Sequence, residues 1–281
     1  MAIDLHCHTK ISDGSMGIDE LIATAKRRGV TTLAITDHDA LAGAARAVVI
    51  GKRQGIDVLP GAEFSAWDSE RETKVHILAY LCDTPDRLEG LCHRMAVRRR
   101  EAALKMLQKV LRYYPIVPES VTRHAAGSTA IFKQHIMHAL MDAGYADAIF
   151  GETYHKLFNA HDGLAFETVV YPDVRTVTDS IRDAGGLVVI AHPAAYHNEE
   201  LIAELAEENR LDGVEVWHPR QNENQVVYLT DFADAHGLLK TGGTDFHGMY
   251  SDLVHPIGNP DVPADTPALI RAYKARKQRE R

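Results

Sequence analysis

The chain has 281 residues, of which 45% are hydrophobic and 25% charged, as in an ordinary soluble globular protein. Its formal charge of −8 argues against stable, non-specific binding to nucleic acid, and no run of roughly 18 apolar residues is present that could span a membrane. Three cysteines cannot make a disulfide framework, and the start of the chain does not resemble a signal peptide, so we expect a cytoplasmic protein.

Short apolar runs alternate with helical patterns over the first 85 residues, and the same rhythm returns from about residue 174. The predicted strands are 3–5, 33–35, 58–59, 75–81, 187–190, 213–217 and 238–241. Helices are predicted over 18–25, where Gly29 follows as a stop, and over 40–54. This alternation predicts an α/β fold built on a mostly parallel sheet or barrel.

The middle of the chain carries almost no strand signal. Thr84-Pro85 supplies a helix cap with a proline in the first turn, and a second helix over roughly 129–143 ends near Gly144. We therefore expect a helical insert over residues 86–159, which either only packs or covers one end of a barrel made by residues 1–85 and 160–281.

Side chains that bind metals stand at the ends of predicted strands, and they include several of the sixteen histidines. The clusters are His6-Cys7-His8, Thr36-Asp37-His38-Asp39, Gly61-Ala62-Glu63, His192-Pro193 and Asp245-Phe246-His247. Because alternate residues of a strand share a face, His6 and His8 can bind one ion while Cys7 packs on the other side. Imidazoles and carboxylates suit manganese, zinc or iron more than calcium.

Single residues of these clusters also have simpler explanations. Asp13 lies in an Asp-Gly turn, and either Asp37 or Asp39 could cap the helix predicted from residue 40. His76 lies within an apolar strand, where a lone histidine is more often a hydrogen-bonded core residue than a ligand. The five clusters together are harder to attribute to packing.

The motifs resemble those of the polymerase and histidinol phosphatase (PHP) family of metal-dependent phosphoesterases. The resemblance covers residues 1–82 and about 174–258 and implies a distorted barrel of roughly seven β/α units with a helical insert domain. It also implies two or three divalent ions (manganese, zinc or iron) and three sets of ligands. These sets are His6, His8, Glu63 and Asp245 for one ion, Glu63, His76 and His192 for a second, and Asp13, His38 and His247 for a third.

Several cations in one pocket suit hydrolysis of a phosphate ester, by a hydroxide held between two of the ions. We expect Asp245 to relay a proton and His218, in Trp217-His218-Pro219, to be the candidate acid for the leaving group. A hydrolase of C–N bonds is one alternative. Another is a non-catalytic, metal-stabilised interaction domain.

The substrate is expected to be a small phosphorylated metabolite. Nucleotide bisphosphate phosphatases and 5′-3′ exoribonucleases of the family carry Ser-Arg-x-His in the insert, whereas this chain keeps Ser128 but has Thr129 and Ile131 in the other positions. Loss of that phosphate clamp favours 5-phosphoribosyl 1,2-cyclic phosphate over a nucleotide bisphosphate or 5′-phosphorylated RNA. The candidate phosphate contacts are Ser128, Lys133, His135 and Arg220. Three of them have equally simple explanations: Lys133 as a solvated helix residue, His135 as a buried helix residue and Arg220 as a cation in a loop.

Overall fold

A computed structural model describes residues 2–252 and 255–280, and its centre is a sheet of seven strands that follow one another in chain order. The strands are β1 Ala2–Cys7, β2 Val30–Ile35, β3 Asp57–Asp68, β4 Thr73–Tyr80, β5 Leu187–Ile190, β6 Gly213–Trp217 and β7 Leu239–Gly242. Four of the six strand pairs are parallel, as expected, but β4 runs antiparallel to both β3 and β5. The connection between β3 and β4 is too short for a parallel crossover, so these strands form an antiparallel hairpin.

The sheet closes where β1 meets the segment that follows β7. The N–H of His8 donates to the carbonyl of Phe246 at 2.9 Å, next to a parallel bridge between Cys7 and Phe246. The buried carboxylate of Asp4 accepts hydrogen bonds from the N–H groups of Thr244 (2.9 Å) and Gly258 (2.8 Å) at the same seam. The fold is the expected distorted (β/α)7 barrel.

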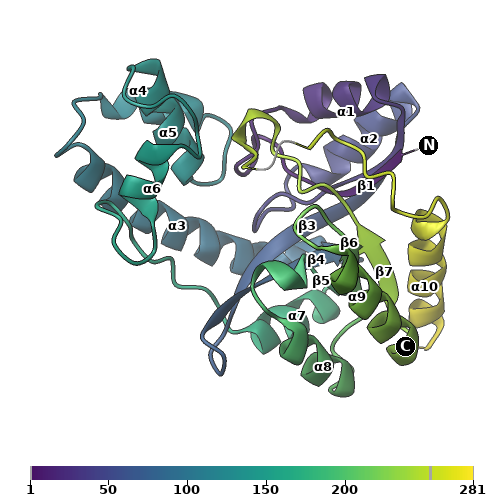
Figure 1. Cartoon of the computed structure of the whole chain (residues 1–281). Helices are drawn as coiled ribbons and strands as arrows, with labels where there is room; N and C mark the ends of the chain where they lie inside the picture. The colour runs from purple at the N-terminus through teal and green to yellow at the C-terminus, as the bar shows by residue number, and fades with distance from the viewer. Residues whose placement is uncertain (1, 253–254, 281) are drawn as a thin grey trace.

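Helices α1 Ile18–Arg27, α2 Ala44–Gln54, α7 Val174–Asp183, α8 Glu199–Glu207, α9 Glu223–His236 and α10 Thr266–Glu280 surround the barrel (Figure 1). On α7, Val174, Val177 and Ile181 recur at helical spacing and are fully buried against the sheet. Helix α2 begins at residue 44 instead of 40, because Asp39 adopts a left-handed conformation (φ 51°) and its N–H donates to the carbonyl of Glu63.

Four helices between β4 and β5 form the insert, which lies to one side of the barrel in Figure 1. A short 3-10 turn, η1 Pro85–Leu88, leads into α3 Glu89–Val110, followed by α4 Pro118–His124, α5 Lys133–Asp142 and α6 Glu152–Phe158. These helices pack around their own apolar cluster, which also takes in Tyr250 from the barrel. Helix α5 begins later than residue 129, because Thr129 donates its N–H to Ile11 of the barrel at 2.8 Å.

Helix α3 is anchored to the barrel by an ion pair. The guanidinium of Arg99 donates to Oδ2 of Asp39 at 2.7 and 3.0 Å and to the hydroxyl of Ser65 at 2.7 Å. All three side chains are buried, so removing one charge would leave the other without compensation. In the described part of the chain, no helix is both long enough and apolar enough to cross a bilayer.

Candidate metal centre

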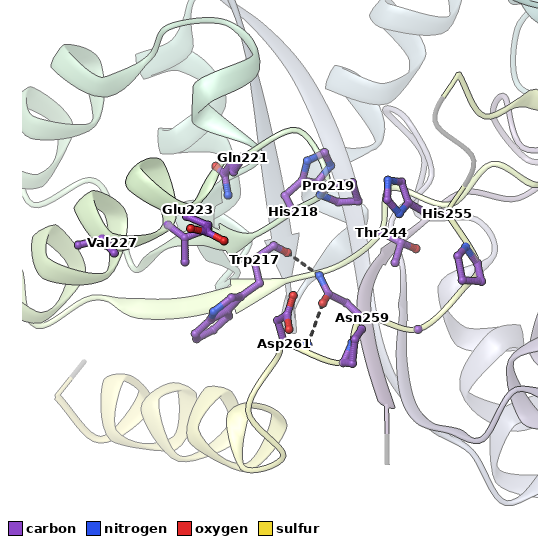
Figure 2. A pocket seen from close by; sticks show the side chains of 14 residues that line it. Trp217, His218, Pro219, Gln221, Glu223, Val227, Thr244, His255, Asn259 and Asp261 are labelled. Carbon is purple, nitrogen blue, oxygen red and sulfur yellow. Dashed lines mark hydrogen bonds between the residues drawn. The ribbon is translucent and has the colours of Figure 1, made fainter.

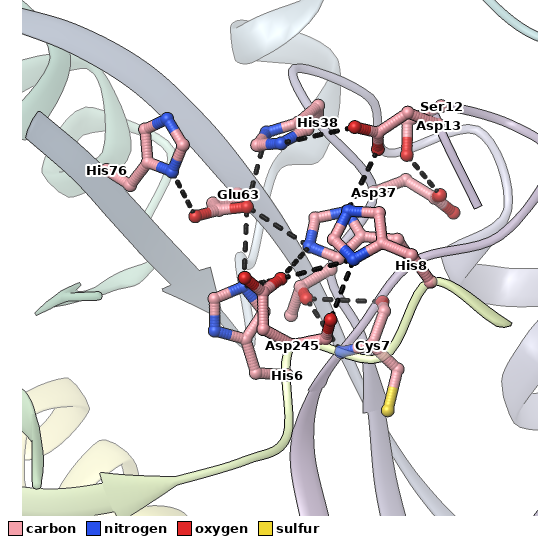
Figure 3. A network of polar contacts seen from close by, with 12 residues as sticks. His6, Cys7, His8, Ser12, Asp13, Asp37, His38, Glu63, His76 and Asp245 are labelled. Atoms are coloured by element: carbon pink, nitrogen blue, oxygen red, sulfur yellow. Dashed lines mark hydrogen bonds and ion pairs between the residues drawn. The ribbon is translucent and has the colours of Figure 1, made fainter. Parts of the chain in front are cut away.

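The carboxylate of Glu63 lies at the centre of the histidine cluster and is fully buried (Figure 3). Strand β3 carries it into the barrel, where Oε2 lies 3.3 Å from Nε2 of His6, 3.1 Å from Nε2 of His8 and 3.2 Å from Nδ1 of His38. These three histidines come from the ends of β1 and β2. One carboxylate oxygen therefore faces imidazoles from two neighbouring strands.

The other oxygen of Glu63 faces the opposite side of the barrel. Its Oε1 lies 2.7 Å from Nδ1 of His76 on β4 and 3.2 Å from Nε2 of His192, which follows β5. His76 points into the cluster because of the β3–β4 hairpin, in which it pairs with Ser65. The two oxygens of Glu63 thus separate two groups of histidines.

Asp245 completes the group at His6 and His8. Its Oδ1 lies 3.4 Å from Nε2 of His6 and 3.1 Å from Nε2 of His8. The backbone of Asp245 is left-handed (φ 53°), which turns the carboxylate toward β1. Ligand atoms of His6, His8, Glu63 and Asp245 all lie within 4.8 Å of one another, close enough to share one ion.

Asp13 forms a third group at the edge of the insert. Its Oδ1 lies 3.3 Å from Nε2 of His247, and its Oδ2 lies 3.9 Å from Nε2 of His38 and accepts a hydrogen bond from Gln134 of α5 at 3.1 Å. His8 lies against the same group, with its ring stacked on that of His247 at 4.1 Å. The structure thus brings all nine predicted ligands into one cluster.

Many polar atoms of this cluster are buried without a hydrogen-bond partner among the described residues. They include Nε2 of His6, both ring nitrogens of His8 and His76, Nδ1 of His38, Oδ1 of Asp13 and Oε2 of Glu63. Orphaned buried polar groups cost free energy unless something satisfies them. A set of imidazole nitrogens and carboxylate oxygens at this spacing fits divalent manganese, zinc or iron.

The electrostatics of the cluster favour ionised carboxylates. Burial alone would raise the pKa of Glu63, Asp13 and Asp245, but the surrounding histidines lower each pKa well below its ordinary value. Burial lowers the pKa of His76 to about 3, with Lys74 contributing. Burial would also lower the pKa of His6, His8 and His247, but the surrounding carboxylates raise it, that of His8 to about 10. A cation that binds here would therefore displace protons from these rings.

Glu215 on β6 belongs to the same network, although it is absent from the predicted site. Its buried carboxylate accepts a hydrogen bond from the N–H of His192 at 2.8 Å and lies 3.1 Å from Nδ1 of His6. It therefore orients the ring of His6 and fixes the backbone at His192 from behind. The only sequence signal for this role is a glutamate within the apolar strand Val214-Glu215-Val216.

The carboxylate of Asp37 binds the loop that connects His8 to Asp13. It accepts hydrogen bonds from the N–H and hydroxyl of Thr9 and from the hydroxyl of Ser12, each at 2.7 Å. Asp37 therefore holds the loop between His8 and Asp13, and it does not cap α2, whose first turn has no side-chain cap. Cys7 is buried in the apolar cluster behind β1, as expected.

His218, the predicted acid, lies between the cluster and a cavity of about 800 Å³ that is also lined by Trp217, His255 and Asn259 (Figure 2). Its Nδ1 accepts the N–H of Arg220 at 3.1 Å, so the neutral ring carries its proton on Nε2. That nitrogen lies 3.8 Å from Oδ2 of Asp245. Burial lowers the pKa of His218 and favours the neutral ring.

The four predicted phosphate contacts lie in different surroundings. Lys133 lines a cavity of about 490 Å³ between the insert and the cluster, together with Asp13 and His38. The hydroxyl of Ser128 lies 2.6 Å from the carbonyl of Ser12, and His135 is buried with its Nδ1 accepting the N–H of Phe132. Arg220 forms an ion pair with Asp252.

We predict that Glu215→Gln weakens metal binding about 10–100-fold, because the neutral amide holds the ring of His6 and the N–H of His192 less strongly than the carboxylate does. Calorimetric titration with Mn²⁺ measures this change. Glu207→Gln is the matched control, since Glu207 is exposed on α8. Equal affinities for wild type and Glu215→Gln would contradict the orienting role.

Comparison with known proteins gives relatives that cover nearly the whole chain. A phosphoribosyl 1,2-cyclic phosphate 1,2-diphosphodiesterase of Eggerthella lenta is 34% identical over 91% of this chain and 97% of its own length. The 5′-3′ exoribonuclease Rnm of Escherichia coli K12 is 30% identical over 87% of this chain and 84% of its own length.

A solved structure from Bifidobacterium adolescentis, assigned as a metal-dependent phosphoesterase, is 28% identical and superposes with a TM-score of 0.84 over 96% of both chains. The sequence pattern of the PHP domain matches residues 4–166, which include most of β1, all of β2 to β4 and the helices α3 to α6 of the insert. The barrel and the clustered side chains agree with these similarities. The chain therefore belongs to the PHP domain family of metal-dependent phosphoesterases.

Proposed function

We propose that this phosphoesterase hydrolyses a small sugar phosphate that carries a second phosphate, 5-phosphoribosyl 1,2-cyclic phosphate, and removes the phosphate after the ring has opened. The observation that carries the proposal is the 490 Å³ cavity, which has residues of the metal centre on one wall and cations of the insert on the other. A cavity of this size suits a small molecule. The similarity to the Eggerthella lenta diphosphodiesterase supports the same substrate.

The nine clustered side chains are proposed to hold two or three divalent ions. His6, His8, Glu63 and Asp245 would hold one, Glu63, His76 and His192 a second, and Asp13, His38 and His247 a third. Bound divalent ions activate water and neutralise charge on the phosphoryl oxygens. Within this arrangement Glu63 would hold two ions apart, because its two oxygens face different histidines.

Asp245 and His218 are proposed to handle the protons. Oδ1 of Asp245 faces His6 and His8, while Oδ2 faces His218, so the carboxylate can take a proton from attacking water. The Nε2–H of the neutral His218 ring, the candidate acid, would donate a hydrogen bond to the leaving oxygen, and the proton that Asp245 takes from water would be passed to that oxygen. His218 is buried, whereas the side chain of Asp245 is 20% exposed, so water can reach its carboxylate.

Lys133 is proposed to bind the phosphate that does not react. Its ammonium lies over the ring of Phe166 at 5.0 Å and over the ring of Phe158 at 5.7 Å, which hold it at the cavity wall. Arg99, in the same cavity, is already paired with Asp39. Lys74, over the ring of Tyr171 at 5.2 Å, is a second cation for the same phosphate.

A nuclease acting on 5′-phosphorylated RNA is the second candidate, because the Escherichia coli exoribonuclease covers most of this chain. Against it, the insert positions expected for an arginine and a histidine hold Thr129 and Ile131. Thr129 instead binds the barrel loop at Ile11, and Ile131 packs on the insert core.

The three cysteine thiols are free, so we propose that the reaction takes place in the reducing cytoplasm.

A substrate panel on the manganese-loaded protein tests the proposal. We predict that 5-phosphoribosyl 1,2-cyclic phosphate is turned over with a higher kcat/KM than adenosine 3′,5′-bisphosphate, histidinol phosphate or a short 5′-phosphorylated RNA, measured by phosphate release and product analysis. Faster hydrolysis of the bisphosphate or the RNA would overturn the substrate. No release from any of them would contradict the proposed activity.

The charge of Lys133 gives a pH-dependent prediction. Burial, with a smaller effect of Lys74, lowers the pKa of Lys133 to about 8, so its positive charge is present below that pH and lost above it. We therefore predict that kcat/KM falls as pH rises through about 8, and that Lys133→Arg moves this fall to higher pH. Identical profiles for both proteins would contradict the assignment.

A variant without the charge separates substrate binding from the chemical step. Lys133→Met is expected to raise KM about 10–100-fold, the cost of one hydrogen bond to a charged group, while kcat changes less. Lys156→Met is the control, since Lys156 is exposed on α6.

A further inference from the structure

We infer that helices α4 and α5 of the insert form a further divalent-cation site from His124, His138 and Asp142, separate from the centre at Glu63. His124 is the last residue of α4, and His138 and Asp142 stand four residues apart on α5. Residues at this spacing share one face of a helix. Two imidazoles and one carboxylate thus converge from two helices that pack against each other.

The distances are those of a site that an ion can enter with small movements. Nε2 of His124 lies 2.8 Å from Oδ2 of Asp142, and Nε2 of His138 lies 3.9 Å from Oδ1 of the same carboxylate. Two ligands of a tetrahedral zinc ion are about 3.4 Å apart, which falls between these values. Ligand atoms of the three residues all lie within 4.8 Å of one another.

The two rings are arranged like a pair in the metal centre itself. His124 and His138 stack with their centroids 3.8 Å apart and their planes 19° apart. His8 and His247 stack in the same way, at 4.1 Å and 14°. Parallel stacking of two imidazoles beside a shared carboxylate therefore occurs twice in the chain, once around Asp13 and once around Asp142.

Tyr250 supports His138 from the barrel. Its hydroxyl lies 2.7 Å from Nδ1 of His138, which leaves Nε2 of that ring directed at Asp142. Metal-binding histidines are commonly held in this way through their second nitrogen.

Tyr250 connects the proposed site on α4 and α5 to the main metal centre. Tyr250 lies in the 3-10 turn η3 Gly248–Tyr250, directly after His247. An ion at His124, His138 and Asp142 would join α4 and α5 and, through Tyr250, hold the insert against the loop that carries Asp245 and His247. Asp142 is exposed, so the ion can exchange with solvent. This donor set suits zinc, cobalt or nickel instead of calcium or magnesium.

Equilibrium dialysis against Zn²⁺, with metal counted per chain, tests the site in the full-length protein. We expect Asp142→Asn and His138→Gln each to bind one ion fewer than wild type. His155→Gln, which removes an exposed histidine from the same insert, is expected to bind as many ions as wild type. Circular dichroism with a thermal melt verifies that all four proteins are folded.

A second readout compares proteins in which the main metal centre is unchanged. Zn²⁺ is expected to raise the Tm of wild type and His155→Gln by more than that of Asp142→Asn, because only the first two can bind the ion between α4 and α5. Equal zinc stoichiometry in wild type, Asp142→Asn and His138→Gln would overturn the proposal. The three side chains would then be a hydrogen-bonded contact between α4 and α5.

Discussion

The buried carboxylate of Glu63, with imidazoles on both of its oxygens, is the interaction on which the rest of the structure depends. A carboxylate without water or a cation is costly to bury, and five histidines within 3.3 Å surround this one. Those histidines come from β1, β2, β4 and β5, so the carboxylate is surrounded only when the barrel is folded. Asp37 and Glu215 then hold the ligand loops from behind, which makes the cluster a property of the whole sheet.

The insert contributes the other half of the site by lying over the open end of the cluster. Gln134 reaches Asp13 from α5, Thr129 binds Ile11, and Arg99 of α3 pairs with Asp39. These contacts leave a cavity with metal ligands on one side and the ammonium of Lys133 on the other. In the function that we propose, the barrel would set the reaction class, while the insert would limit the size and charge of the substrate. The His124–His138–Asp142 group lies where these two parts meet through Tyr250.

The parts of the site that the sequence predicts are local. His6, His8, Asp245 and His247 stand beside strand ends in the sequence, so their clustering follows from the topology alone. His76 needed the family resemblance, because its direction depends on an antiparallel hairpin that apolar periodicity does not distinguish from a parallel strand. Glu215 was missed, since a single acidic residue in a strand gives no pattern. Among the predicted phosphate contacts, Lys133 faces the cavity while His135 is buried within α5, a difference that only packing decides.

The most direct test of this account is an anomalous difference map of the manganese-loaded protein, measured at a wavelength where manganese scatters anomalously. The account predicts two or three peaks inside the cluster, with one near Oε2 of Glu63, between His6 and His8, and another near Oε1, between His76 and His192. Well-ordered side chains with no peak beside either oxygen of Glu63 would contradict it.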